Sequence, residues 1–425
     1  MTTKLLYQGQ ITDPSGYAVA GRGYIRSIYD YIKKNELDID FKVVSMSADS
    51  QNALTREESE FLDSLSFESS EEIDEWVEDE DYHYMFHHPP VYAWKLDATK
   101  FFASRSATTT CVTVWETDAM PPVWNDILTA LEVDRIVVPC EWNKISFDKS
   151  LKKLGRPVPV KTIPHLINDD FVGSKDVAPL RGRIRGSLTQ KIVEDDEFNV
   201  LTVGQWTDRK ALLNVVKAFL MEFKDNEDCN LIIKTYGNIQ DPRPEYQEAQ
   251  KQEMAKQIAA LKKSILNDTL NGGPKCKMHL LYGLFPKEQM NYLYQEADLF
   301  ALFSRAEGFG LPIAEALTHE TPVIVHDKGG HVGFVDPVNN YIVDSYLTPA
   351  HCTIFPFVYS CDSNWFETDY LSARAQLRAA YSQWKEEPEN FAQRGPAAKQ
   401  YMLEVTGDSL KIGQSLVDFV LNENE

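Results

Sequence analysis

The sequence lacks any run of about eighteen apolar residues, the length that a membrane-spanning helix needs. Its first residues, Met1 to Gly9, also lack the long apolar core of a signal peptide. We therefore expect a cytoplasmic protein without a membrane span.

Cysteine is scarce, and the six cysteines are scattered without a CxxC pair or a His-rich cluster. Disulfide frameworks and zinc sites depend on such spacings, so neither is predicted. The DxD-like pieces Asp38-Ile39-Asp40 and Asp79-Glu80-Asp81 follow no convincing apolar strand. We therefore predict no metal site.

Positive charge is also limited, because 43 Lys and Arg residues face 64 Asp and Glu residues, for a net charge of −21. Such a chain repels nucleic acids and acidic membranes on average, although a local basic cleft can override the average. A polyanionic substrate is disfavoured but stays open. The 425 residues, 43% of them hydrophobic, suffice for two domains with separate cores.

The most informative stretch is residues 304–316. The apolar residues 299–303 before it predict a buried parallel strand. A loop with Gly308 and Gly310 follows, and Pro312 fits the first position of a helix. Backbone N–H groups at such a helix start suit a phosphate, and glycine lets a ligand approach closely.

Two carboxylates, Glu307 and Glu315, flank this loop. Ionised carboxylates only accept hydrogen bonds, and a sugar ring and a ribose offer hydroxyl donors. Taken singly, Glu315 is typical of a solvated helix face and Glu307 of a charged loop. Together with the glycines they predict two grips on one long ligand, a sugar joined to a nucleotide.

Glu307, seven residues and then Glu315, around Gly-Phe-Gly-Leu-Pro, resembles the signature of retaining glycosyltransferases of family 4, the glycosyl transferases group 1, which have the GT-B fold. The resemblance is continuous from about Val200 to Val335 and patchy before it. It implies that Glu307 contacts the donor sugar and that Glu315 binds the ribose. The residues that it places by the sugar and diphosphate are Gly308, Phe309, Gly310 and Leu311.

Parallel-strand patterns in both halves agree with this resemblance and predict an α/β protein of the GT-B class, with two Rossmann-like domains facing a central cleft. The C-terminal helix, predicted at residues 409–421, would cross back to the first domain. A further helical pattern runs from Trp365 to Trp384. The expected segments are an N-terminal acceptor domain 1–172, a linker 173–197, a C-terminal nucleotide-sugar domain 198–395 and a final segment 396–425.

Arg209 and Lys210 open the helix predicted after the strand at 198–204. Cations are disfavoured at a helix N-terminus unless an anion shares the site, so the pair hints at a diphosphate; an exposed basic pair is the alternative. The resemblance gives Lys210 the place of the family lysine. Gln205 stands where the family has arginine, so Arg209 is assigned the second charge, and Lys234 is a further cation near the cleft.

Two more places are assigned by the resemblance. Tyr282, Gly283 and Leu284 end a strand like the one that faces the nucleotide base. Gly16 and Tyr17 lie in a loop expected near the donor phosphates and the acceptor, although a plain connecting loop is equally consistent for Tyr17.

The first half departs from many relatives after the strand that begins at Cys111. Those relatives carry a histidine there that touches the donor sugar, whereas this chain has Trp-Glu-Thr-Asp, a pattern that one branch of the family shares. Glu116 is therefore the candidate for that place. His165 is a possible cleft residue, with a satisfied structural histidine as the alternative.

The leading hypothesis is an enzyme that transfers a hexose or pentose from a UDP- or GDP-sugar to an acceptor hydroxyl, with retention, and with no cofactor or metal required. Its catalytic candidates are Glu307, Lys210, Arg209 and Glu116. The acceptor, a glycan, a protein, a small molecule or modified DNA, is open.

Other functions stay open on the sequence alone. A phage-type enzyme would act on a hydroxymethylated DNA base flipped out of the duplex. A nucleotide-sugar-binding protein without catalysis would fit the departures at Gln205 and Glu116. A GT-B epimerase or phosphorylase is a third option.

Overall fold

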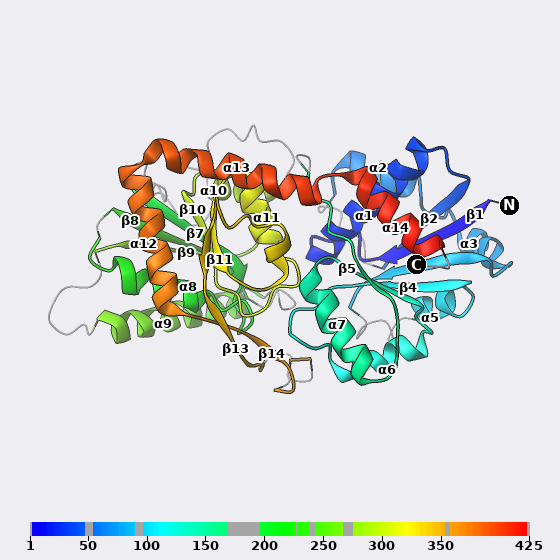
Figure 1. The fold of residues 1–425 in the computed structure, drawn as a ribbon, viewed down its shortest axis with the longest axis horizontal. Coiled ribbons are helices and arrows are strands. Elements are labelled where there is room, and N and C mark those ends of the chain that lie inside the picture. Colours follow the sequence, from blue (N-terminus) through cyan, green and yellow to red (C-terminus); the bar gives the residue numbers. More distant parts are fainter. Residues whose placement is uncertain are drawn as a thin grey trace. The chain divides into compact units, whose positions relative to one another are not determined.

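The computed structural model describes residues 2–46, 54–89, 97–168, 196–226, 228–237, 241, 243–266, 275–352, 358–359 and 361–422. The chain forms two compact units, Met1–Asn168 with Val405–Glu425, and Asp169–Glu404 (Figure 1). The expected linker 173–197 lies outside the described residues except for its last two. The limits of the expected domains stay a prediction.

The first unit contains a six-stranded sheet with the order β2-β1-β3-β4-β5-β6, and every neighbouring pair is parallel. Its strands are β1 (Thr3–Gly9), β2 (Ile39–Ser45), β3 (Tyr82–His87), β4 (Thr108–Val112), β5 (Arg135–Val138) and β6 (Val160–Thr162). Its helices are α1 (Gly16–Lys34), α2 (Arg56–Asp63), α3 (Ser70–Val77), α5 (Asp97–Ala103), α6 (Pro122–Ala130), α7 (Glu141–Lys153) and α14 (Ser409–Leu421).

The C-terminal helix α14 packs on α1, as Figure 1 shows at the red end of the chain. The two backbones approach closely, because a Cβ on Gly413 would lie 2.0 Å from the carbonyl oxygen of Ser27. Ile412 and Leu416 of α14 share one hydrophobic core with Ile25 of α1. The expected return of the last helix to the first domain is therefore confirmed.

The second unit contains another parallel six-stranded sheet, with the order β12-β11-β10-β7-β8-β9, and a separate antiparallel hairpin. The sheet strands are β7 (Phe198–Gln205), β8 (Cys229–Tyr236), β9 (Lys277–Tyr282), β10 (Leu299–Leu302), β11 (Val323–His326) and β12 (Tyr341–Val343), and the hairpin is β13 (Ser345–Pro349) with β14 (Asn364–Thr368). The helices are α8 (Leu212–Phe223), α9 (Pro244–Leu266), α10 (Lys287–Gln295), α11 (Leu311–Thr318), the short 3-10 turn η1 (Gly330–Gly333), α12 (Tyr370–Glu386) and α13 (Pro388–Thr406).

Two parallel sheets with helices between their strands confirm the predicted α/β class and the GT-B fold. Read from β9, the second sheet has the doubly wound order 3-2-1-4-5-6, whose direction reverses between β7 and β10. The first sheet reverses between β1 and β3. Such reversal points separate the loops on either side and are where open α/β sheets bind ligands.

Two local expectations were wrong. Trp365 belongs to strand β14, and the following helix begins only after Asp369, whose carboxylate caps it by accepting hydrogen bonds from the N–H groups of Leu371 and Ser372. Arg209 and Lys210 do not open a helix; they lie in a turn, and α8 begins two residues after Lys210.

Candidate nucleotide-sugar site

The reversal point of the second sheet carries the charged residues that the sequence singled out. The loop after β7 holds Arg209 and Lys210, and the loop after its neighbour β10 holds Glu307. Parallel strands bring their carboxyl ends to one edge, so residues almost a hundred positions apart meet there.

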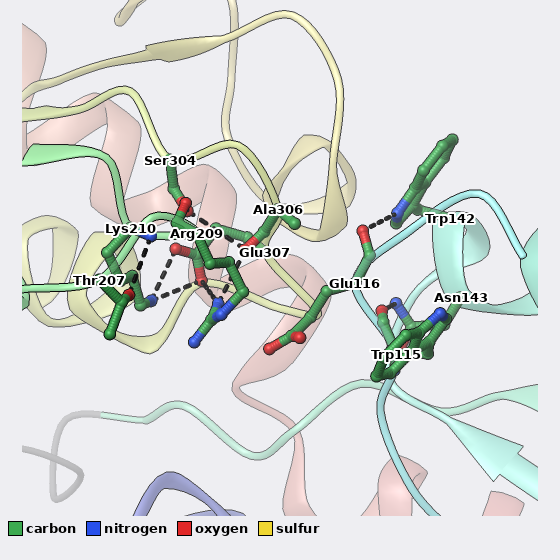
Figure 2. A network of polar contacts seen from close by, with 10 residues as sticks. All are labelled: Trp115, Glu116, Trp142, Asn143, Thr207, Arg209, Lys210, Ser304, Ala306 and Glu307. Carbon is green, nitrogen blue, oxygen red and sulfur yellow. Dashed lines mark hydrogen bonds and ion pairs between the residues drawn. The ribbon is translucent and has the colours of Figure 1, made fainter. Parts of the chain in front are cut away.

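Lys210 and Glu307 form a close ion pair (Figure 2). The Lys210 ammonium nitrogen lies 2.6 Å from Oε1 and 2.9 Å from Oε2 of Glu307, whose side chain is only 6% exposed. Arg209 is the second cation, with Nη1 at 3.9 Å from Glu307 Oε2. Burial by itself raises the pKa of Glu307, but the attraction of Lys210 and Arg209 outweighs burial and leaves the pKa lowered.

Hydrogen bonds hold the two charged loops together as one piece. The Ser304 hydroxyl and the Arg305 backbone N–H both donate to the Arg209 carbonyl oxygen, at 3.1 and 2.8 Å. Arg209 Nη1 donates in return to the Ala306 carbonyl oxygen at 2.8 Å (Figure 2). The cations and the carboxylate are therefore fixed before any ligand binds.

The glycine loop follows directly and has the conformation that only glycine adopts without strain. Gly310 has φ +101° and begins α11 without a side-chain cap. The neighbouring turn presses against this loop: a Cβ on Gly330 would lie 2.3 Å from the Gly308 carbonyl oxygen, and the Gly330 N–H donates to the Glu307 carbonyl at 2.9 Å. The uncapped helix start lies beside the ion pair and can receive an anion.

Glu315 lies on α11, is half-buried, and is held by Tyr294 of α10. The Tyr294 hydroxyl donates to Glu315 Oε2 at 2.6 Å. Burial raises the pKa of Glu315, and the Tyr294 hydrogen bond and nearby lysines oppose that rise without cancelling it.

The ends of β8 and β9 hold the remaining donor candidates. Lys234 is 3% exposed and donates to the Gly283 carbonyl oxygen at 2.7 Å; burial lowers its pKa to about 8, although the Glu315 carboxylate acts in the opposite direction. Tyr282 donates to Gln247 Oε1 at 2.6 Å, and Leu284 is 61% exposed. Lys234 therefore links the strand that bears it to the turn expected to face the base.

Gln205, which replaces the family arginine, ends β7 and donates through Nε2 to the Gly237 carbonyl oxygen at 3.4 Å. The positive charge of the turn therefore comes from the residues after it, Arg209 and Lys210.

In the first unit, the candidates Gly16, Tyr17 and Glu116 also gather at the carboxyl edge of the sheet. Gly16 is exposed at the start of α1. The ring of Tyr17 packs against the ring of His87 at the end of β3, with the two ring centroids 5.4 Å apart. The Tyr17 hydroxyl lies 3.5 Å from Thr113 Oγ1, and burial, assisted by the negative charge of Glu116, raises the pKa of Tyr17. Tyr17 and Glu116 thus lie near one another.

The loop that bears Glu116 is held rigidly by α7. Asn143 is fully buried and bonds the backbone of Trp115 in both directions, accepting from its N–H at 3.1 Å and donating to its carbonyl at 2.7 Å (Figure 2). The Trp142 indole N–H donates to the Glu116 carbonyl oxygen at 3.0 Å. The half-buried Glu116 carboxylate is presented on a fixed backbone.

His165 is a buried, hydrogen-bonded histidine of the core, the second of the two alternatives given for it. It is 4% exposed, and burial lowers its pKa to about 3. Tyr24 donates its hydroxyl to the Ile163 carbonyl at 2.8 Å and so accepts a hydrogen bond from His165 Nδ1 at 3.0 Å.

Sequence reasoning missed the residues that hold the site residues in place, chiefly Tyr294 and the ion pair of Arg305 with Glu367. Arg305 stood inside the signature, and neither it nor Tyr294 was assigned a role. No sequence signal connects Glu367 to Arg305, because their contact depends on the hairpin.

Within the described ranges, no group of three or more His, Cys, Asp or Glu residues is arranged to hold a metal ion. In the same part of the chain, no helix is long and apolar enough to cross a membrane. All six cysteines are described, and each is a free thiol.

The fold is that of the GT-B class, and the candidate site lies at the reversal point of its second sheet. The family described as "Glycosyl transferases group 1" matches residues 187–351, the segment that carries Lys210, Glu307 and Glu315. The resemblance drawn from the signature is confirmed there. Comparison with curated protein sequences gives no match.

Solved structures share the fold over the whole chain. A glycosyltransferase from Rickettsia africae is 13% identical, with a TM-score of 0.61 and 100% of each chain covered. The Anabaena protein HepE, in complex with UDP and glucose, is 12% identical, with a TM-score of 0.59 over 98% of this chain and 99% of that one. An α,α-trehalose-phosphate synthase (UDP-forming) from Burkholderia vietnamiensis is 10% identical, with a TM-score of 0.59 over 99% of each chain.

Proposed function

We propose that this protein transfers a sugar from a nucleotide-diphosphate sugar to an acceptor hydroxyl, with retention of anomeric configuration and without a metal. The observation that carries the proposal is the buried Lys210–Glu307 pair at the reversal point of the second sheet, beside an uncapped helix start. A cation and a carboxylate side by side suit a ligand that combines an anionic diphosphate with sugar hydroxyls. The family match over this segment supports the same reading.

The chemistry follows from where charge develops. Cleavage of the bond between the anomeric carbon and the phosphate oxygen leaves an oxocarbenium-like sugar and an additional negative charge on the diphosphate. Lys210, Arg209 and the N-terminus of α11 are fixed in advance and would stabilise that charge. Glu307 would accept hydrogen bonds from the sugar hydroxyls.

For retention, the acceptor oxygen attacks the anomeric carbon from the face that the phosphate leaves. A departing phosphate oxygen takes the proton of the incoming hydroxyl, so no side chain of the protein is assigned as general base. Glu116 and Tyr17 are assigned to the sugar and acceptor side, Glu315 to the ribose, and Lys234 with residues 282–284 to the base and its surroundings.

The donor is proposed to be a UDP- or GDP-sugar carrying a hexose or pentose. Of the compared proteins, HepE was solved with UDP and glucose, and an E. coli structure contains UDP-2-fluoro glucose. A glycan, a protein or a small molecule is the proposed acceptor class, and the net charge of −21 disfavours DNA. The cytoplasm stays the predicted location.

A panel of nucleotide sugars tests the proposal. The correct donor should raise the melting temperature and, with an acceptor extract, release nucleoside diphosphate; a non-catalytic binder would show only the first effect. The anomeric configuration of the product, read by NMR, tests retention. A panel in which no UDP- or GDP-sugar shifts the melting temperature would overturn the proposal.

A further inference from the structure

Glu315 is proposed above as the ribose ligand, and its orientation depends on a tyrosine that lies beneath it. A carboxylate that no neighbour holds samples several rotamers, and a ligand must then restrict them at an entropic cost. Here Glu315 Oε2 accepts a hydrogen bond of 2.6 Å from the Tyr294 hydroxyl. One oxygen is thus engaged on the protein side, and Oε1 is the carboxylate oxygen that Tyr294 does not hold.

Tyr294 can position Glu315 because its own side chain is held in place by its neighbours. Tyr294 is only 1% exposed. Its ring stacks on that of His319, with the ring centroids 5.5 Å apart and the planes at 21°, and the centroid of the Phe300 ring of β10 lies 5.7 Å away. Its backbone carbonyl accepts a hydrogen bond of 2.6 Å from Thr321 Oγ1. The phenol is therefore anchored to the strand before the glycine loop and to the end of α11.

The contact also satisfies the hydrogen-bonding requirement of both partners. A buried tyrosine hydroxyl needs a hydrogen-bond acceptor, and a half-buried carboxylate needs a donor to remain ionised. Lys287, Lys210 and Lys234 add positive charge near Glu315, but the side-chain hydrogen bond to its carboxylate comes from Tyr294. Tyr294 is the neighbour that fixes the direction of the carboxylate.

We infer that Tyr294 is a positioning residue for nucleotide recognition: it holds Glu315 so that Oε1 faces the ribose hydroxyls. The inference rests on the proposed function, because it assumes that the second unit binds a nucleoside diphosphate. Its consequence is specific. Removing the Tyr294 hydroxyl should weaken recognition of the ribose hydroxyls and leave the contacts to diphosphate and base in place.

The test is a thermodynamic cycle with two nucleotides and two proteins. UDP and 2′,3′-dideoxy-UDP are titrated by calorimetry into the wild-type chain and into Tyr294→Phe; the corresponding guanosine pair is used if GDP binds better. We expect the wild type to prefer the ribonucleotide and Tyr294→Phe to lose roughly three- to tenfold in UDP affinity while dideoxy-UDP affinity stays unchanged. Loss of the Tyr294 hydroxyl should also raise the pKa of Glu315, because that donor favours the charged carboxylate. As the pH is lowered, UDP binding should therefore begin to weaken at a higher pH in the variant than in the wild type.

Two further variants secure the result. Tyr341→Phe removes the hydroxyl of another buried tyrosine of the same unit, which donates to Gln383 at 2.7 Å, and should leave both affinities unchanged. If Tyr294→Phe does not fold, Glu315→Asp breaks the same contact from the other side and should abolish the ribonucleotide preference.

The outcomes separate the inference from the function. An equal affinity loss of Tyr294→Phe for UDP and dideoxy-UDP overturns the positioning role alone. A wild type that does not distinguish the two nucleotides overturns the ribose role of Glu315 and the positioning role with it. A wild type that binds neither UDP nor GDP overturns the proposed function itself.

Discussion

Arg305 and Glu367 form an ion pair that joins the signature loop to the β13–β14 hairpin, with Arg305 Nε at 2.7 Å from Glu367 Oε2. The same guanidinium donates from Nη1 to the Asp208 carbonyl oxygen at 2.8 Å, within the turn that carries the two cations. Glu367 Oε1 accepts a second hydrogen bond, of 2.6 Å, from Asn214 of α8. One carboxylate therefore fixes the signature loop and, through Arg305, the turn before α8.

Replacing Arg305 by Gln should raise the donor KM by about tenfold and lower kcat less, because the cations remain but their turn is no longer held. Initial rates at varied donor concentration measure this, and Arg305→Lys should not restore KM since a single ammonium cannot bridge Glu367 and Asp208. Arg378→Gln is the matched control: it breaks the 2.6 Å pair with Glu222 elsewhere in the unit and should lower the melting temperature without changing KM. Equal effects of both variants on KM would contradict the role.

Features of the fold that depend on neighbouring residues could be predicted from the sequence, and features that depend on distant residues could not. Helix α14 has the predicted bounds, and the strand, glycine loop and helix around Glu307 have the predicted order. Such features depend on neighbouring residues. The helical pattern at 365–384 failed because the buried Trp365 and Phe366 fit a helical spacing as well as a strand, and only the pairing with β13 decides between them.

The site was predicted as a set of residues and not as a set of contacts. The resemblance brought Lys210 and Glu307 to one ligand, but their direct pairing depends on β7 and β10 being neighbours in the sheet. The supporting contacts of Tyr294 and Arg305 likewise join elements whose relative positions in the fold cannot be predicted from the sequence.

Lys210→Met should lower kcat/KM by about a hundred- to a thousandfold, because a preorganised cation at the leaving diphosphate is lost. Nucleoside diphosphate release measures it. Lys217→Met is the control: Lys217 is also half-buried in this unit, and its ammonium lies 3.8 Å from the ring centroid of Tyr370 rather than near Glu307. Near wild-type turnover of Lys210→Met would remove Lys210 from the reaction.

The ion pair also predicts how stability depends on pH. The folded-state pKa of Glu307 lies below its usual 4.5, despite burial, because Lys210 and Arg209 favour the charged form. The stabilisation is therefore fully present above the unfolded pKa and is lost as pH falls through the folded pKa. The difference in unfolding free energy between the wild type and Glu307→Gln should be constant near pH 7 and shrink below about pH 4.5.

Urea unfolding of both proteins at several pH values measures this difference. Glu288→Gln on α10, at an exposed position, is the matched control for removing one carboxylate from the same unit. A difference for Glu307→Gln that does not change with pH would show that Glu307 is not held in the charged form by its neighbours.

The contact between Gly330 and the glycine loop yields the sharpest steric prediction. A Cβ at residue 330 would lie 2.3 Å from the Gly308 carbonyl oxygen and 2.6 Å from the Phe309 nitrogen, and backbone atoms cannot yield as a flexible side chain would. Gly330→Ala should therefore displace the loop that is proposed to face the sugar and diphosphate, weakening donor binding by at least tenfold and lowering the melting temperature. Gly333→Ala, in the same 3-10 turn, is the control, since a Cβ there meets no atom within 4 Å. Calorimetric titration with the donor distinguishes the two variants: equal donor affinity in both would mean that the loop beside Gly330 does not contact the donor.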